Sequence, residues 1–197
     1  MKKIIGNAKI YCKGLLTRSR CSSLPFHNIQ HTMDVYEHVL KIGMYENRDL
    51  QELESVLLAA LFHDTGNATV FAGHEKYSVT EASNFLLAQK CPPEKIDLIV
   101  SCIKATRMPQ RPKGIYEEII CDADLFHLGT EQYQSKNNLL RKEWSKFLHT
   151  VYSDADWYSM NIEFMEKHRF FTKYGKEILE PVKQKNLQQL KQYRKRL

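Results

Sequence analysis

The chain has 197 residues, of which 43% are hydrophobic and 26% are charged, and its formal net charge is +6. This composition predicts a folded globular protein, and the absence of an apolar run of about 18 residues or of an apolar N-terminal stretch argues against a membrane-spanning or secreted chain. Its five cysteines are scattered and form no CxxC pair, which favours reduced thiols in the cytoplasm over disulfides or a cysteine metal site.

Apolar residues recur at helical spacing along almost the whole chain, and strand signals are nearly absent. Short segments rich in proline, glycine, serine and asparagine separate the helical stretches. No repeat or linker divides the sequence, so we expect one all-α helical bundle over residues 1–197. The predicted helices cover about residues 3–18, 28–45, 49–66, 74–89, 92–103 and 115–128, and at least three more pieces follow, with breaks near Ser153-Asp154 and Gly175.

For the third and fourth predicted helices, the apolar spacing predicts which side chains face the core. Asp49 is a good N-cap for the third helix, which should bury one apolar face. The side chains expected to point inward are Leu53, Val56, Leu57, Ala60 and Leu61 on the third helix, and Tyr77, Ala82, Phe85 and Leu86 on the fourth.

The positive charge is concentrated at the end of the chain. Residues 181–197 contain six basic residues and no acidic one, whereas the other 180 residues carry 23 of each. The simplest interpretation is a solvated helix end, which the helix dipole favours. Weak contact with nucleic acid or another anionic surface is the alternative.

His63 and Asp64 are the most informative residues for function, because they are two unlike metal ligands side by side. An imidazole and a carboxylate together suit a hard or borderline divalent cation. His31 on the second predicted helix and Asp124 inside the sixth could reach the same point in a bundle core. Apolar neighbours surround each residue, and a buried carboxylate without a compensating charge is costly. The pattern therefore predicts a divalent cation, with a structural His–Asp contact as the alternative.

These residues and their neighbours resemble the H…HD…D pattern of the HD-domain superfamily of metal-dependent phosphohydrolases. The segment FHNIQHTMDV at residues 26–35 is similar to the YHNxxHxxDV segment of cyclic-nucleotide phosphodiesterases, and LFHDTG at 61–66 is similar to the LxHDxG core. Further similarity lies in Gly73-His74-Glu75, Ser78, Ala82, Ala105-Thr106 and Cys121-Asp122-Ala123-Asp124-Leu125. The resemblance covers about residues 8–130 and implies an HD-type bundle with a C-terminal helical extension over 131–197.

The resemblance implies that His31, His63, Asp64 and Asp124 hold one or two divalent ions, among which Mn, Co, Mg, Fe, Ni and Zn stay open. Asp124 is preferred to Asp122, which we expect to be a surface residue or a support for the ligands. Hydroxide formed at the metal would attack a phosphomonoester or phosphodiester, with Asp64 positioning the water.

Residues close to these ligands are candidates to act on the substrate, and the resemblance suggests the first of them. His27, one turn before His31, would donate a proton to the leaving oxygen, although a loop or capping histidine is the alternative. His74 would bind phosphate or a second metal, or simply cap its helix. Basic residues in the segment before the sixth helix would screen phosphate charge, or form an ordinary surface loop. The predicted substrate-binding residues are Asn28, His74, Lys104 and Arg107.

The sequence therefore predicts a cytoplasmic phosphohydrolase whose partner is a small phosphorylated molecule, in particular a nucleotide. One alternative is a non-catalytic HD module that senses a nucleotide or binds a protein partner. A di-iron oxygenase is the other alternative, but the HD relatives of that kind use additional histidines between the HD pair and the last aspartate, and only His74 stands there.

Overall fold

A computed structural model describes residues 2–197, without the side chain of Lys2, and the predicted all-α fold is confirmed: no strand occurs in this range. The chain divides into two compact units, Met1–Asp124 and Leu125–Leu197. A single HD-type domain over residues 1–197, with a core over about 8–130, stays a prediction. In the described range no helix is long and apolar enough to cross a bilayer.

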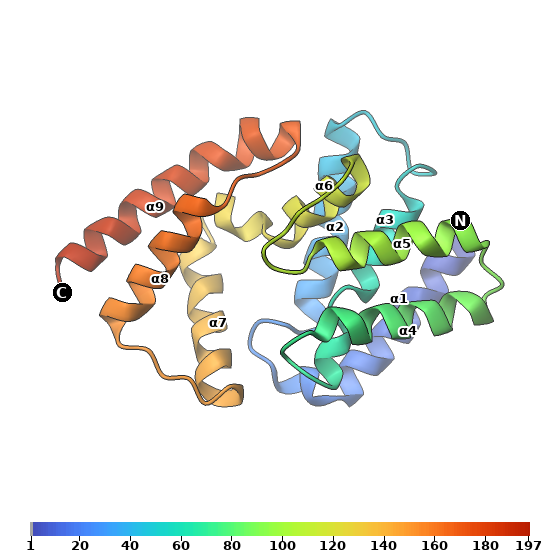
Figure 1. The fold of residues 1–197 in the computed structure, drawn as a ribbon, viewed down its shortest axis with the longest axis horizontal. Helices are drawn as coiled ribbons and strands as arrows, with labels where there is room; N and C mark the ends of the chain where they lie inside the picture. Colours follow the sequence, from blue (N-terminus) through green and yellow to red (C-terminus); the bar gives the residue numbers. More distant parts are fainter. Residues whose placement is uncertain (1) are drawn as a thin grey trace. The chain divides into compact units, whose positions relative to one another are not determined.

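The first unit contains six α-helices and two short 3₁₀ turns (Figure 1). The helices begin and end close to the predicted positions, except at α3 and α6. They are α1 (Lys2–Arg18), α2 (Ile29–Tyr45), α3 (Glu54–Phe62), α4 (His74–Ala88), α5 (Pro93–Ala105) and α6 (Ile115–Asp124), and the turns are η1 (Arg20–Ser23) and η2 (Thr65–Ala68).

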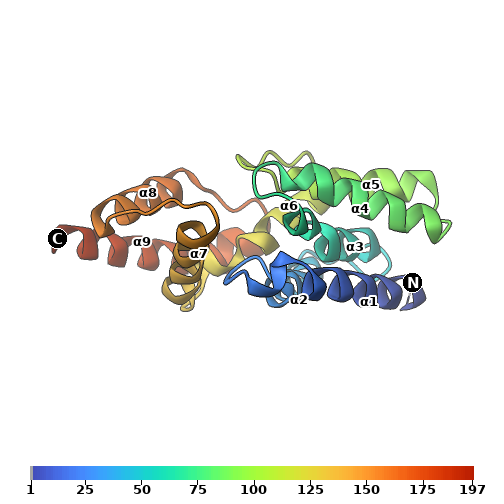
Figure 2. The same ribbon diagram turned by 90° about the horizontal axis from the view of Figure 1, so that it is seen from below.

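Helix α3 is the centre of the first unit. Figure 2 shows α1 and α2 on one side of it and α4 and α5 on the other. All nine residues of α3 are buried, so the prediction of a single apolar face was wrong. A helix that is covered on both sides must be apolar almost all round, and the sequence ESVLLAALF fits this requirement.

Two further expectations for this unit need correction. Asp49 does cap a turn, since its Oδ1 accepts from the backbone N–H groups of Gln51 and Glu52, but α3 itself begins only at Glu54. Tyr77 is 44% exposed and does not point into the core. The buried face of α4 includes Ser78 and Ala82, and Tyr77 lies about 100° around the helix from Ser78.

Helix α6 ends at Asp124, four residues earlier than predicted, so Asp124 is its last residue and is not inside it. The chain leaves the helical conformation at Leu125, which has φ −93° and ψ 15°. A separate 3₁₀ turn, η3 (Phe126–Gly129), then begins the second unit.

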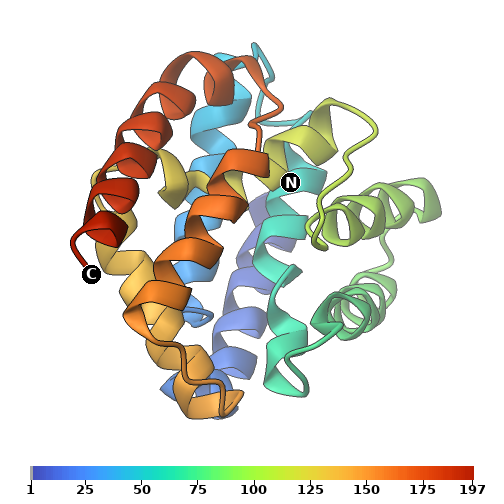
Figure 3. The ribbon, with the colours of Figure 1, turned by 60° about the vertical axis from the view of Figure 1, so that its left-hand side comes forward.

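The second unit contains α7 (Tyr133–Phe147), α8 (Asp154–Lys167), a π-helical turn (Gly175–Leu179) and α9 (Glu180–Lys195). Figure 3 shows α8 beside α9. The interpretation of residues 181–197 as a solvated end is wrong for Lys183, which is fully buried. Its Nζ donates to the His168 carbonyl at 2.6 Å and lies 2.9 Å from Glu180 Oε1, because a buried ammonium needs such partners.

Candidate metal centre

Helices α2, α3 and α6 bring four of the predicted site residues to one point in the first unit. His31 lies in the first turn of α2, where its ring is buried. His63 and Asp64 directly follow α3, and Asp124 is the last residue of α6. Each helix therefore delivers its ligand from an end turn.

The donor atoms of these four residues face one another. His31 Nε2 is 3.4 Å from Asp64 Oδ2 and 3.3 Å from Asp124 Oδ1. His63 Nε2 is 3.4 Å and 3.5 Å from the same two oxygens. The ligand atoms of His31, His63 and Asp124 all lie within 4.8 Å of one another. Two nitrogens and two oxygens thus surround a small shared space.

This arrangement fits a divalent cation better than a set of hydrogen bonds. Within the described part of the chain, His31 Nε2, His63 Nε2 and Asp64 Oδ2 are buried and make no hydrogen bond. Ligands about 2.1 Å from a metal ion stand roughly 3.0–3.4 Å apart in octahedral or tetrahedral geometry, which is close to the separations seen here. A cation would satisfy all three buried atoms at once.

Backbone contacts hold the His63 ring in the orientation that a metal needs. Its Nδ1 lies 2.8 Å from the Ala60 carbonyl oxygen. A carbonyl can only accept, so Nδ1 carries the hydrogen and donates it. The lone pair of Nε2 is then directed at the cluster, as in most histidine metal ligands.

The cluster keeps its carboxylates ionised. Burial alone would raise the pKa of Asp64, but the neighbouring imidazoles of His63 and His31 outweigh it and hold that pKa well below its usual range. The pKa of Asp124 is lowered in the same way, because the imidazoles of His31 and His63 outweigh the effect of burial. In return, the pKa values of both histidines are raised despite their burial. Ionised carboxylates are available to a metal at neutral pH, and the metal would displace protons from the histidines.

His74 joins the cluster from the start of α4. Its Nε2 lies 3.1 Å from Asp64 Oδ1, and its Nδ1 lies 2.8 Å from the Phe71 carbonyl oxygen. Burial lowers the pKa of His74, but its hydrogen bond to Asp64 and the charge of that carboxylate raise it to about 9. The two oxygens of Asp64 therefore serve different sides of the site.

A close contact between η2 and α4 places His74 beside Asp64. The Gly66 N–H donates to Ser78 Oγ at 2.8 Å. A Cβ at position 66 would collide with the carbonyl oxygen of His74 and lie 2.8 Å from the Ser78 nitrogen. The glycine of the HDTG segment is thus needed for the approach of the helix that carries His74.

His27 lies at the edge of the cluster. Its half-buried ring is centred 5.7 Å from the His31 ring and 6.4 Å from the His74 ring. Phe26 packs against both rings, with centroid distances of 4.8 Å to His27 and 4.9 Å to His31. The position of His27 is compatible with proton donation to a substrate, and that role stays a prediction.

Asn28 supports the site through the backbone. Its Oδ1 accepts from the N–H groups of Gln30 and His31, and its Nδ2 donates to the carbonyls of Leu24 and Pro25. Asn28 is therefore the N-cap of α2 and orients the turn that carries His31. Its predicted contact with substrate stays a prediction.

Lys104 and Arg107 are not brought into the cluster. Lys104 was expected in a loop but lies in the last turn of α5, and Arg107 follows this helix. Both residues are exposed. Among residues 2–197 neither makes an ion pair or a hydrogen bond with the four clustered residues. Their role in binding phosphate stays a prediction.

Two residues near the site were judged incorrectly or missed. Asp122 is fully buried, which excludes the first of its two predicted roles, a surface residue; the second, a support for the ligands, stays a prediction. His38 was not considered, although its Nδ1 lies 3.3 Å from the Ala123 carbonyl oxygen, beside Asp124. The available signal was its spacing of seven residues from His31, which places both on one face of α2.

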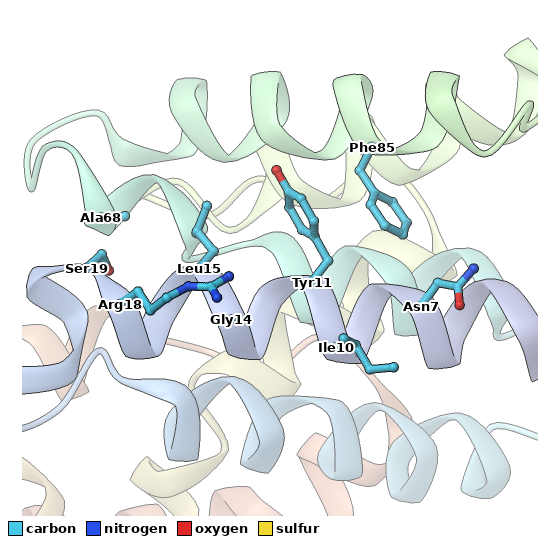
Figure 4. Close-up of a pocket in the computed structure, with 9 residues that line it drawn as sticks. All are labelled: Asn7, Ile10, Tyr11, Gly14, Leu15, Arg18, Ser19, Ala68 and Phe85. Carbon is cyan, nitrogen blue, oxygen red and sulfur yellow. The ribbon is translucent and has the colours of Figure 1, made fainter.

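A separate groove lies between α1 and α4 (Figure 4). Its volume is about 670 Å³, and apolar side chains such as Leu15 and Phe85 form most of its lining. None of the predicted site residues lines it. The groove and the histidine–aspartate cluster are therefore distinct features of the first unit.

Comparisons with known proteins agree with this geometry. A family model described as the HD domain matches residues 28–129, just over half of the chain and all four clustered residues. Among solved structures, the crystal structure of Bacillus subtilis YpgQ in complex with ADP matches with a TM-score of 0.68 and 19% identity, covering 98% of this chain and 97% of that one. At this identity the likeness shows the fold alone. A search of curated proteins finds no match.

Proposed function

Since the chain belongs to the HD-domain family, a family of metal-dependent hydrolases, we propose that it cleaves a phosphomonoester or phosphodiester bond in a nucleotide or a related small molecule. The observation that carries this proposal is the cluster of His31, His63, Asp64 and Asp124, with buried donor atoms that no hydrogen bond satisfies among the described residues. The crystal structure of YpgQ contains ADP, which supports a nucleotide as the first class of substrate to test.

In this proposal the four clustered residues hold the metal, and the residues around them prepare the substrate. When bound, a divalent cation would draw charge from a phosphoryl oxygen and make a water molecule a stronger nucleophile. Asp64 Oδ2 faces the cluster, so this carboxylate would orient the water. His74, at the other oxygen of Asp64, would contact a phosphoryl oxygen. His27 would protonate the departing oxygen from the edge of the site.

The donor set narrows the choice of metal. Two imidazoles and two carboxylates suit Mn, Fe, Co, Ni or Zn, whereas Mg prefers sites made of oxygen alone. We therefore expect higher activity with Mn or Co than with Mg.

The test is hydrolysis by protein that has been stripped with a chelator and reloaded with one metal at a time. Phosphate and pyrophosphate release would be measured on a panel of nucleoside mono-, di- and triphosphates and simple phosphoesters. We expect Asp64→Asn to lower kcat/KM by at least about 100-fold, because it removes a charged ligand. Asp97→Asn, at an exposed position of α5 in the same unit, is the matched control and should change little.

Two results would contradict the proposal. One is activity in Asp64→Asn equal to that of the wild type. The other is a wild-type protein that binds metal and nucleotide without turnover, which would indicate the non-catalytic HD module.

A further inference from the structure

The backbone next to Asp124 is held by a side chain from another helix. His38, half-buried on α2, has its Nδ1 3.3 Å from the carbonyl oxygen of Ala123, 85 residues away in the sequence. Because a carbonyl only accepts, Nδ1 carries the hydrogen and donates it to Ala123.

This carbonyl is one that the helix itself leaves unsatisfied. In a continuing helix, the Ala123 oxygen would accept from the N–H four residues later, at His127. Helix α6 ends at Asp124, and the chain turns away at Leu125, so that partner is lost. The last carbonyls of a helix need an outside donor, and His38 supplies one.

The same helix also contacts the side chain of Asp124. His31 and His38 are seven residues apart, about two turns, and share one face of α2. His31 Nε2 lies 3.3 Å from Asp124 Oδ1, while His38 reaches the peptide carbonyl immediately before Asp124. One helix thus contacts both the carboxylate of Asp124 and the peptide carbonyl that precedes this residue.

Asp124 needs such support because of its place in the fold. It stands at the last position of its helix and at the boundary of the first unit, with no further turn of α6 behind it. Terminal turns fray readily unless they are tied down. A metal ligand that moves by a fraction of an ångström loses affinity, so its backbone must be held.

We propose that His38 is a positioning residue of the metal centre, which anchors the last turn of α6 so that Asp124 completes the ligand set. This inference rests on the metal binding in the proposed function, but not on hydrolysis. In this role His38 acts on the backbone that precedes Asp124.

The test is the affinity of metal-free protein for Mn²⁺, measured by calorimetry well below the unfolding temperature. His38→Leu removes the donor and should weaken Mn²⁺ binding by about 10- to 100-fold. His38→Asn keeps an N–H donor near the position of Nδ1 and should stay within about threefold of the wild type. His149→Asn changes an exposed histidine of the second unit and is the control, because asparagine tolerates the positive φ of 53° at this position. If His38→Leu does not fold, His38→Gln, whose donor lies one bond further out, should show the same loss.

A double variant separates positioning from general packing. In an Asp124→Ala background, His38→Leu should add no further loss of Mn²⁺ affinity, because the carboxylate that it positions is gone. Unchanged affinity in His38→Leu, or losses that add in the double variant, would overturn the inference while leaving the proposed function intact. A wild-type protein that binds Mn²⁺ but hydrolyses nothing would remove the proposed function and leave the inference standing.

Discussion

Asp64 uses its two carboxylate oxygens for different partners. Oδ2 faces the imidazoles of His31 and His63, and Oδ1 lies 3.1 Å from His74 Nε2. In metal-free protein this one anion stabilises the protonated forms of its neighbours. Protons and metal ions therefore compete for the same group of side chains.

The stability of the metal-free protein should depend on pH through His74. Its pKa, about 9 in the folded protein, is higher than about 6.5 in an unfolded chain. The stabilisation is therefore complete below about pH 6.5 and disappears as the pH rises through about 9. We expect the loss of this stabilisation to lower the free energy of unfolding by up to about 3 kcal/mol, measured by urea denaturation in EDTA.

His74→Gln is the comparison that isolates this effect, since His31 and His63 titrate in the same direction. The difference in stability between wild type and variant should be largest near pH 6 and smallest near pH 9.5. Parallel profiles over this range would show that the His74–Asp64 pair does not stabilise the fold.

At the scale of helices and turns, the HDTG segment (residues 63–66) and the GHE segment (residues 73–75) are in direct contact. Gly66 lies against the first turn of α4, and its N–H donates to Ser78 Oγ. These segments are separate motifs in the sequence. In the fold they are two sides of a single contact, which sets the position of His74 relative to Asp64.

Replacing Gly66 by a larger residue should destabilise this contact more than removing the hydrogen bond between Gly66 and Ser78. Gly66→Ala places a Cβ against backbone atoms of His74 and Ser78, which cannot rotate away, so we expect a loss of about 2–4 kcal/mol in the free energy of unfolding. Ser78→Ala removes the hydroxyl acceptor alone and should cost about 1–3 kcal/mol.

Only Gly66→Ala should also displace His74, so it should flatten the pH dependence described above, whereas Ser78→Ala should preserve it. Urea denaturation at pH 6 and pH 9.5 tests both variants. A Gly66→Ala protein as stable as the wild type would mean that η2 and α4 can separate freely.

Errors in the prediction of helices also arise at this scale. The apolar residues of α3 were counted as one face, but helices pack on both sides of it and bury all of its surface. Tyr77 fits an apolar pattern, yet the contact with Gly66 turns Ser78 inward and leaves Tyr77 at the surface. The spacing of apolar residues indicates which face of a single helix is hydrophobic. It does not indicate which other helices pack against that helix, because those helices are distant in the sequence.

At the scale of the whole molecule, all four clustered residues belong to the first unit, and the second unit has a buried polar group of its own. Lys183 is fully buried and bonds to the His168 carbonyl and Glu180. Burial lowers the pKa of Lys183, and Glu180 opposes that shift. These contacts join α9 to the segment that follows α8.

Lys183→Met should therefore weaken the second unit and leave the metal centre unchanged. The substitution removes the donor to the His168 carbonyl, which should lower the free energy of unfolding of this unit by about 1–3 kcal/mol. Lys185→Met, at an exposed position of the same helix, should have no such effect. Mn²⁺ affinity in both variants, measured below the unfolding transition, should match the wild type. A weaker affinity in Lys183→Met would show that the second unit supports the site.

The sequence by itself determined the helical class, most helix boundaries and the residue types that suit a divalent metal. These properties depend on near neighbours: apolar residues at helical spacing, the Asn28 cap, and the adjacent His63 and Asp64. Only the tertiary structure decided that α3 is covered on both sides, that Asp124 ends its helix, and that His38 holds the preceding carbonyl. Such contacts depend on how helices distant in the sequence pack, and no local pattern specifies that packing.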